Sequence, residues 1–173
     1  PAGVSFRVCE VTDMAPEPFD VIVTLGTMEH MDDPGAFLRH VAMLAADEGD
    51  ILITCPHFIN LRGFVWMAFA LTLDVPVSLT DLHFIHPWQM EEWAKDAGVR
   101  VLEMKSCDQI RGNGSDLPRD FDKRLRNALR DASLPNDRVD QYIAHLDKLT
   151  QHLQNIGNDY RLDGATALYR LTR

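Results

Sequence analysis

The sequence predicts an α/β fold built around parallel strands, and residues 19–56 carry most of this prediction. An apolar run rich in β-branched residues at 21–25 indicates a strand buried on both faces. Asp33 and Pro34 then resemble a helix N-cap followed by a proline at the first helical position. The helix carries apolar residues at an i, i+4 spacing, and a second apolar strand follows it at 51–55. Strand, helix and strand of these lengths predict a parallel βαβ unit.

Elements on both sides of this unit extend the pattern. Residues 4–9 alternate apolar and polar side chains, which predicts a further strand. Residues 47–50 contain Gly and acidic residues that turn the chain before the second strand of the unit. Residues 56–82 form an apolar insertion, in which Asn60 could cap a helix.

The second half adds one more strand, a pair of helices and a last strand. A helix starts at His86 and Pro87 and ends before Gly98, and residues 99–104 form the next strand. A polar loop should follow. The last elements are predicted helices at 118–132 and 136–156 and a strand at 165–171. The apolar stripe of the second helix predicts packing within the domain, and a two-helix cap or a dimer seam are the alternatives.

Composition excludes several classes of protein. With 46% hydrophobic and 25% charged residues, the chain is that of an ordinary globular domain. The net charge of −9 argues against a nucleic-acid surface, which favours a basic patch. The three cysteines lack metal-ligand spacing and predict reduced thiols in a cytoplasmic protein. The longest apolar run, 64–73, is shorter than the roughly 20 residues that a membrane helix needs.

Polar residues follow both strands of the central unit. Ligands of open parallel sheets bind beyond the carboxyl ends of the strands. Glu29 and His30 follow the first strand, and His57 and Asn60 follow the second. Because both strands run in the same direction, we expect these four residues to gather at one edge of the sheet.

In combination, the motifs resemble the second half of class I S-adenosylmethionine-dependent methyltransferases, in particular the small-molecule O- and C-methyltransferases of ubiquinone biosynthesis. The motifs that carry the resemblance are 19–23, Met28-Glu29-His30, Asp33-Pro34, 49–53, Pro56 and, further on, 81–84, Pro87, Met90, Trp93 and 97–99. The resemblance spans residues 4 to about 105 and resumes at the last strand.

The resemblance implies a Rossmann-like methyltransferase sheet of order 3-2-1-4-5-7-6. Residues 4–9 would be strand three, 21–25 strand four, 51–55 strand five, 99–104 strand six and 165–171 the antiparallel strand seven. Strands one and two, with the Gly-x-Gly-x-Gly loop of the cofactor site, have no counterpart in the chain. We therefore expect residues 1–173 to be a single, N-terminally incomplete domain, a fragment that is inactive by itself. Residues 116–157 would be a helical-pair insertion before the last strand.

The resemblance also assigns residues to the cofactor, S-adenosyl-L-methionine. Glu10 would accept from the adenine amino group, and Val11 would offer its backbone N–H to the ring. Leu25, Gly26 and Thr27 would run alongside the methionine part of the cofactor, where glycine permits a close approach of the backbone. A solvated loop and a plain strand-ending turn are the structural alternatives.

Methyl transfer mainly requires alignment, and an O–H or N–H acceptor also needs a base, for which histidine is suited near neutral pH. His30 and His83 are the candidate bases. The candidates for acceptor binding are Glu29, His57, Asn60 and His86. No metal is expected, because the acidic residue that metal-binding relatives carry three positions before Glu29 is Gly26 here. For each of these side chains, purely local hydrogen bonding is the alternative.

The function that follows is methyl transfer to a small-molecule acceptor. An apolar or amphiphilic acceptor is expected, because residues 64–73 could form a lid, although they could equally be ordinary core. The expected protein partner is a second copy of the chain, which would form a homodimer through residues 136–156. The alternatives are a non-catalytic methyltransferase-like binding module and a nicotinamide-dependent enzyme of similar topology.

Overall fold

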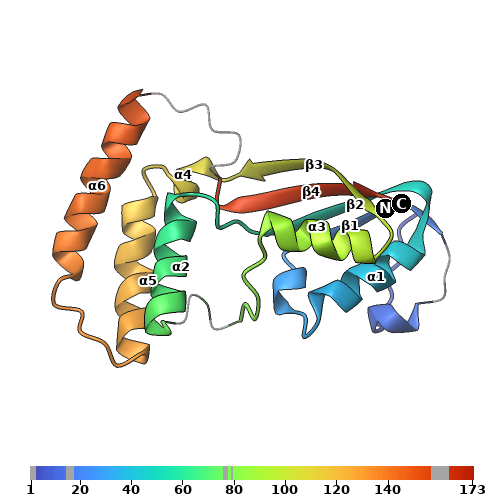
Figure 1. The fold of residues 1–173 in the computed structure, drawn as a ribbon, viewed down its shortest axis with the longest axis horizontal. Helices are drawn as coiled ribbons and strands as arrows, with labels where there is room; N and C mark the ends of the chain where they lie inside the picture. Colours follow the sequence, from blue (N-terminus) through green and yellow to red (C-terminus); the bar gives the residue numbers. More distant parts are fainter. Residues whose placement is uncertain (1–2, 15–17, 76–77, 79, 157–163) are drawn as a thin grey trace.

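The computed structural model describes residues 3–14, 18–75, 78, 80–156 and 164–173, which form a sheet with two helices on one face and a helical unit at one end (Figure 1). Its described strands make one sheet of order β1-β2-β4-β3. The strands are β1 (Phe19–Leu25), β2 (Ala45–Pro56), β3 (Arg100–Cys107) and β4 (Thr166–Thr172). The arrangement is an α/β, Rossmann-like fold.

Strands β1 and β2 form the predicted parallel pair. Leu25 lies opposite Thr54, so the carboxyl ends of both strands reach the same edge of the sheet. β4 lies antiparallel between β2 and β3, as expected of the last strand. The predicted turn at 47–50 is a bulge inside β2, where the register passes from Phe19↔Ala45 to Val21↔Asp50.

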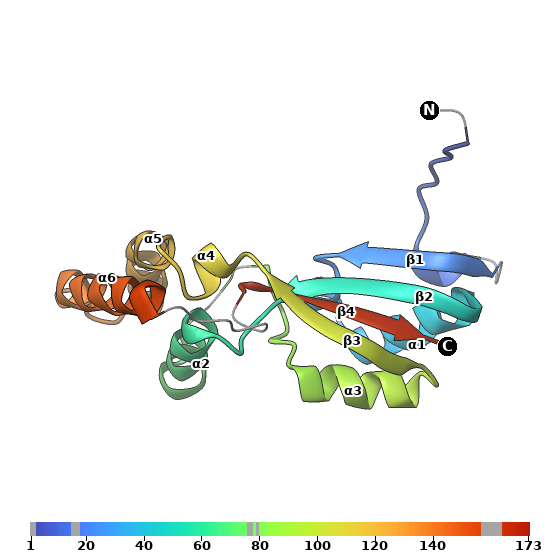
Figure 2. The same ribbon diagram turned by 90° about the horizontal axis from the view of Figure 1, so that it is seen from above.

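Two helices cover one face of the sheet (Figure 2). Helix α1 (Pro34–Leu44) begins as predicted, because the Asp33 carboxylate accepts from the Ala36 N–H at 2.8 Å. Helix α3 (Pro87–Asp96) lies beside α1. Their apolar sides and the inner face of the sheet form the main hydrophobic core, which includes Leu38, Met90, Ile51, Ile53 and Tyr169.

Two predictions about the first strands are wrong. β1 is not buried on both faces, because Val21, Val23 and Leu25 are 53–67% exposed. No described element covers that face of β1, which is also an edge strand. Residues 4–9 do not form a strand, and Phe6 is 91% exposed. A strand needs a neighbour for its N–H and C=O groups, and none of the described strands pairs with this segment.

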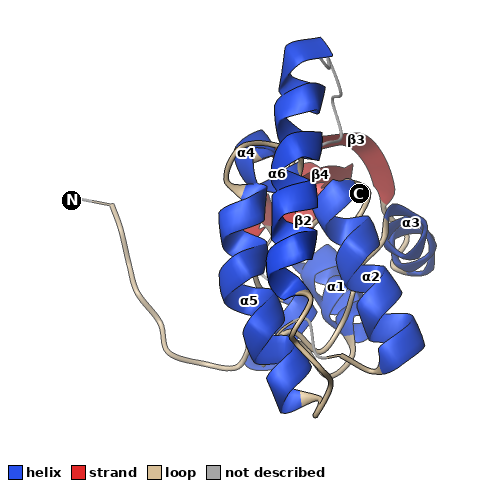
Figure 3. Cartoon of the chain, turned by 90° about the vertical axis from the view of Figure 1, so that its left-hand side faces the viewer, coloured by secondary structure: helices blue, strands red, loops and turns tan. Residues whose placement is uncertain are grey.

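A helical unit lies beyond the carboxyl ends of β1 and β2 (Figure 3). It consists of α2 (Leu61–Leu73), α4 (Gln109–Gly112), α5 (Leu117–Asp131) and α6 (Val139–Ile156). Its own hydrophobic core contains Trp66, which stacks on Phe121 with the ring centroids 4.9 Å apart. The polar loop expected after the strand at 99–104 contains the short helix α4, which is a correction to the prediction. Helix α2 packs with the predicted helical pair. Gly157 and Asn158, which by sequence would cap the helix predicted at 136–156, lie outside the described residues.

Asn60 caps α2 as predicted, accepting from the Gly63 N–H at 2.6 Å. Across the residues that the structure describes, none of the helices combines the length and the apolar character needed to span a membrane.

Candidate functional site

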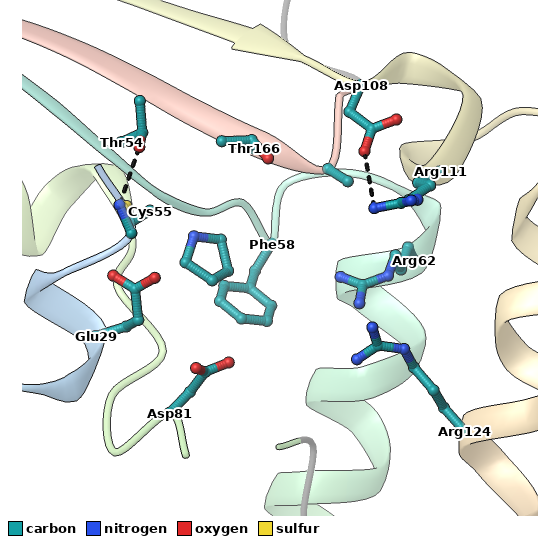
Figure 4. A pocket seen from close by; sticks show the side chains of 13 residues that line it. Glu29, Thr54, Cys55, Phe58, Arg62, Asp81, Asp108, Arg111, Arg124 and Thr166 are labelled. Carbon is teal, nitrogen blue, oxygen red and sulfur yellow. Dashed lines mark hydrogen bonds and ion pairs between the residues drawn. The ribbon is translucent and has the colours of Figure 1, made fainter. Parts of the chain in front are cut away.

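A cavity of about 270 Å³ opens between the sheet and the helical unit (Figure 4). The tips of β1 and β2 form one side of it, Asp81 lies on the same side, and α2, α4 and α5 form the other. A ligand site was expected at these strand tips, and the structure has a cavity there.

Gly26 ends β1 at the rim of the cavity. Its φ of +59° is in the left-handed region that favours glycine. Its N–H donates to the carbonyl oxygen of Thr54 at 3.0 Å and to the Oγ1 of the same residue at 3.1 Å. This fixes the turn next to the tip of β2. Leu25 is exposed, and the hydroxyl of Thr27 lies 3.4 Å from the Leu25 carbonyl oxygen. The cofactor role of these three residues stays a prediction.

Glu29 brings a buried carboxyl group to the cavity. The residue is only 4% exposed, and its Oε2 has no hydrogen-bond partner among the described residues. Burial raises the pKa of the carboxyl group, because the charged form loses its hydration. The main-chain carbonyl of Glu29 accepts from the N–H groups of Leu82 at 2.8 Å and His83 at 3.2 Å. These bonds hold the 81–83 segment against the first strand tip.

His30 is oriented by a main-chain carbonyl. Its Nδ1 lies 2.9 Å from the Thr80 oxygen. Because a carbonyl can only accept, Nδ1 carries the proton, which leaves Nε2 as the acceptor of the neutral ring. Nε2 lies 4.0 Å from Glu29 Oε1, and Nδ1 lies 3.5 Å from Asp81 Oδ1. The ring thus places a basic nitrogen close to the carboxyl group that lines the cavity.

Asp81 joins Glu29 and His30 in a cluster that sequence analysis did not assemble. One ligand atom from each of the three lies within 4.8 Å of the others, a spacing that could hold a divalent cation. However, Nδ1 of His30 is engaged by Thr80, and burial favours the protonated form of Glu29. The set is therefore better suited to moving a proton. The signal that could have found Asp81 is its place in the 81–84 motif.

His57 and Asn60 have structural roles in the described fold. His57 is fully buried, and its N–H donates to the Ala165 carbonyl at 2.9 Å. Besides capping α2, the side-chain amide of Asn60 donates to the carbonyls of Gly164 at 2.7 Å and His57 at 3.1 Å. Neither residue lines the cavity, so their roles in acceptor binding stay predictions without support from the geometry.

The two later histidines also lie outside the cavity lining. His86 precedes α3, its main-chain N–H donates to the side-chain Oε1 of Gln89 at 3.0 Å, and its ring stacks on Trp88 with the centroids 4.3 Å apart. Burial lowers the pKa of its imidazole. His83 takes part through its main-chain N–H, as described above. The assignment of His83 as a base therefore stays a prediction.

Glu10 and Val11 lie on the N-terminal segment, which runs beside the amino end of β1 and away from the cavity (Figures 1 and 2). Glu10 is exposed and precedes the short 3-10 helix Val11–Asp13. The structure does not bring either residue to the cavity, and their contact with adenine stays a prediction.

Sequence analysis missed the opposite wall of the cavity entirely. Arg62, Arg111 and Arg124 come from three different helices and reach the cavity together (Figure 4). No motif connects them, since only the packing of α2, α4 and α5 makes them neighbours. Cys55 also lines the cavity, but burial raises the pKa of its thiol to about 12, so it is not poised as a thiolate nucleophile.

Known proteins share this architecture. A methyltransferase from Haloferax volcanii, solved in a complex with the Trm112 methyltransferase activator, aligns with 97% of this chain and 61% of its own at a TM-score of 0.55 and 18% identity. The [4+2]-cyclase SpnF aligns with 97% of this chain and 55% of its own at a TM-score of 0.52 and 15% identity. At these identities the likeness shows the fold alone.

Comparison with proteins of similar sequence identifies the family as well as the fold. A ubiquinone biosynthesis O-methyltransferase from Pseudomonas savastanoi pv. phaseolicola is 30% identical over 115 residues, which cover 60% of this chain and 48% of that protein. The chain spans about half the length of the curated relatives it matches. The family profile described as a methyltransferase domain matches residues 4–104, more than half of the chain. The chain therefore belongs to this methyltransferase-domain family.

Proposed function

We propose that the protein transfers a methyl group from S-adenosyl-L-methionine to a small-molecule acceptor. The observation that carries this proposal is the Glu29–His30 pair at a strand tip within the family match. Glu29 lines the cavity, and the His30 ring, which lies outside the lining, has its Nε2 4.0 Å from Glu29 Oε1. The family match also favours an enzyme over a non-catalytic binding module.

The tip of β1 fits the cofactor that the family implies. Gly26 turns the chain at the cavity rim with a positive φ that favours glycine, which lets a ligand approach this backbone closely. Leu25, Gly26 and Thr27 would hold the methionine part, and Glu10 and Val11 the adenine ring. When bound, the cofactor supplies a methyl group that is activated by its sulfonium.

The chain's own residues supply proton transfer and orientation. The Nε2 of His30 accepts the proton of an O–H or N–H acceptor, while its Nδ1–H stays on the Thr80 carbonyl. Asp81 Oδ1, 3.5 Å from Nδ1, stabilises the imidazolium that forms. Glu29, whose carboxyl group lines the cavity, orients the acceptor by a hydrogen bond. We prefer His30 to His83 because its ring lies next to a cavity-lining group.

The size of the cavity and the residues around it indicate the kind of acceptor. An engineered cavity of about 150 Å³ holds benzene, so about 270 Å³ suits a substituted ring or a compound of similar size. The exposed Phe64 of α2 fits a lid for an apolar or amphiphilic acceptor. A homodimer through 136–156 would have to use other residues than Val139 and Leu146, which are buried within the chain. We also propose the full order 3-2-1-4-5-7-6 and a cytoplasmic location.

Cofactor binding by the full-length protein tests this function. Calorimetric titration with S-adenosylhomocysteine should show saturable binding, and labelled S-adenosyl-L-methionine should pass its methyl group to a phenol or amine acceptor. A folded full-length protein that does not bind S-adenosylhomocysteine would refute the proposal. Binding without methyl transfer to any acceptor class would support the non-catalytic module instead.

A further inference from the structure

The cavity has two walls of opposite charge. Glu29 and Asp81 form an acidic wall at the strand tips, and Arg62, Arg111 and Arg124 form a basic wall on the helical unit (Figure 4). Phe58 lies between the two walls and is 3% exposed. A ligand that fills the cavity therefore contacts an apolar ring in its middle and groups of opposite charge at its two ends.

The basic wall has more donors than its own carboxylates use. Asp120 is shared by two arginines, accepting from Arg62 Nε at 3.2 Å and from Arg124 Nε at 2.7 Å. Arg111 Nη1 lies 3.5 Å from Asp108 Oδ2. Two carboxylates thus face three guanidinium groups, which leaves one positive charge in excess on this wall.

The geometry of these bonds matters as much as the charge. Both contacts of Asp120 use Nε, so the terminal nitrogens of Arg62 and Arg124 are not engaged by the described carboxylates. In Figure 4 these guanidinium groups extend from their helices toward the cavity. Arg62 is only 13% exposed in its side chain, so its position is fixed by packing and by Asp120. Planar guanidinium groups held in this way match carboxylate and phosphate oxygens.

We propose that the basic wall is the binding subsite for an anionic group, a carboxylate or a phosphate, carried by the methyl acceptor. This inference rests on the proposed function, because it assigns the acidic wall to the methylated end of the same molecule. The acceptor is then a compact amphiphile with its O–H or N–H near Glu29 and His30, its apolar part against Phe58, and its anion on the arginines.

Binding of three matched phenols tests the subsite without any turnover. The probes are 4-hydroxybenzoate, 4-hydroxyphenyl phosphate and the neutral 4-hydroxybenzamide, titrated calorimetrically into the protein at low ionic strength. At least one anion should bind about tenfold or more tightly than the amide, since hydrogen bonds to charged groups are the stronger ones. The preferred anion distinguishes a carboxylate from a phosphate. Equal affinity for all three probes would overturn the proposal.

Variants then locate the effect. Arg111→Gln and Arg124→Gln change side chains that are 60% and 51% exposed, so the fold should tolerate them. Each should weaken anion binding about three- to tenfold and leave amide binding unchanged. Arg130→Gln is the matched control, because Arg130 lies on α5, is 65% exposed and does not line the cavity. An equal loss in the control would show that the effect is general electrostatics, which would also overturn the proposal.

The carboxylate of the cofactor could bind the arginines of the basic wall in place of the acceptor's anion. Titration with S-adenosylhomocysteine, which carries the same carboxylate, tests this alternative. In full-length protein, Arg124→Gln should leave its affinity unchanged. A loss confined to S-adenosylhomocysteine would assign the wall to the cofactor and refute the inference. Anion selectivity in a protein that does not bind S-adenosylhomocysteine would instead leave the subsite standing and refute the methyltransferase function.

Discussion

Replacing Glu29 with glutamine should make the protein more stable at neutral and alkaline pH. The wild-type carboxyl group is 4% exposed, and its Oε2 lacks a partner among the described residues. An unsatisfied buried polar group costs about 1–3 kcal/mol, and a charged one costs more. Glutamine keeps the size of the side chain and removes only the charge. We therefore expect Glu29→Gln to raise the free energy of unfolding by about 1–2 kcal/mol at pH 8.

The pH dependence of this gain follows from the raised pKa. The folded protein holds the Glu29 proton to higher pH than the unfolded chain does. Between the two pKa values unfolding releases a proton, so the stability of the wild type falls as pH rises through this window. Below the ordinary value of 4.5 both states are protonated and the wild-type penalty is absent. The advantage of the variant should therefore be small at pH 4 and should grow toward pH 8.

Urea unfolding followed by circular dichroism at several pH values between 4 and 8 measures this difference directly. Glu92→Gln is the control, because Glu92 is an exposed glutamate on α3. It should change the free energy of unfolding by less than about 0.5 kcal/mol at every pH. A Glu29→Gln protein that is less stable than the wild type at pH 8, or whose gain does not vary with pH, would refute the reasoning.

Three further predictions follow from other parts of the structure. Asn60→Ala should lower the free energy of unfolding by about 2 kcal/mol or more in urea titrations, because it removes the α2 cap and two buried hydrogen bonds; an unchanged midpoint would contradict these roles. In the chain of residues 1–173, Val21→Lys should reduce self-association in light-scattering measurements at little cost in stability, because it places a charge on an exposed apolar edge strand; unchanged scattering would argue that this edge does not mediate self-association. His30→Gln in the full-length protein should reduce methyl transfer about 100-fold or more while S-adenosylhomocysteine binding stays constant. His83→Gln should change the rate much less, and the reverse order would make His83 the base.

Much of the sheet could be predicted because its signals are local. The structure contains strands at the apolar runs 21–25 and 51–55, and it contains the helix caps predicted at Asp33 and Asn60. Burial of β1 could not be predicted in the same way. An apolar run indicates which residues can be buried, but whether they are buried depends on elements from other parts of the chain. No described element covers Val21 and Val23, which are exposed.

The candidate site was predictable where it depends on the strand tips. Parallel pairing brings the ends of β1 and β2 together, and so Glu29 and His30 could be placed beside a ligand site from the sequence alone. Asp81 and the arginines could not, because their positions depend on main-chain hydrogen bonds and helix packing between distant segments. His57 differs from both, because the sequence places this polar residue at a strand tip and the fold buries it fully, and its role in acceptor binding stays a prediction.

The two walls of the cavity also differ in what supports them. The acidic wall lies within residues 4–104, where the family profile matches, and its geometry follows from the pairing of β1 with β2. On the basic wall, Arg62 lies within the match, whereas Arg111 and Arg124 lie beyond residue 104, in the helical unit whose hydrophobic core shares no residue with the core of the sheet. Exposed side chains on that unit can change at a cost of about 0.5 kcal/mol or less without moving the strand tips. The fold therefore allows the charge of the proposed acceptor to be selected on one wall, independently of the residues proposed to accept its proton on the other.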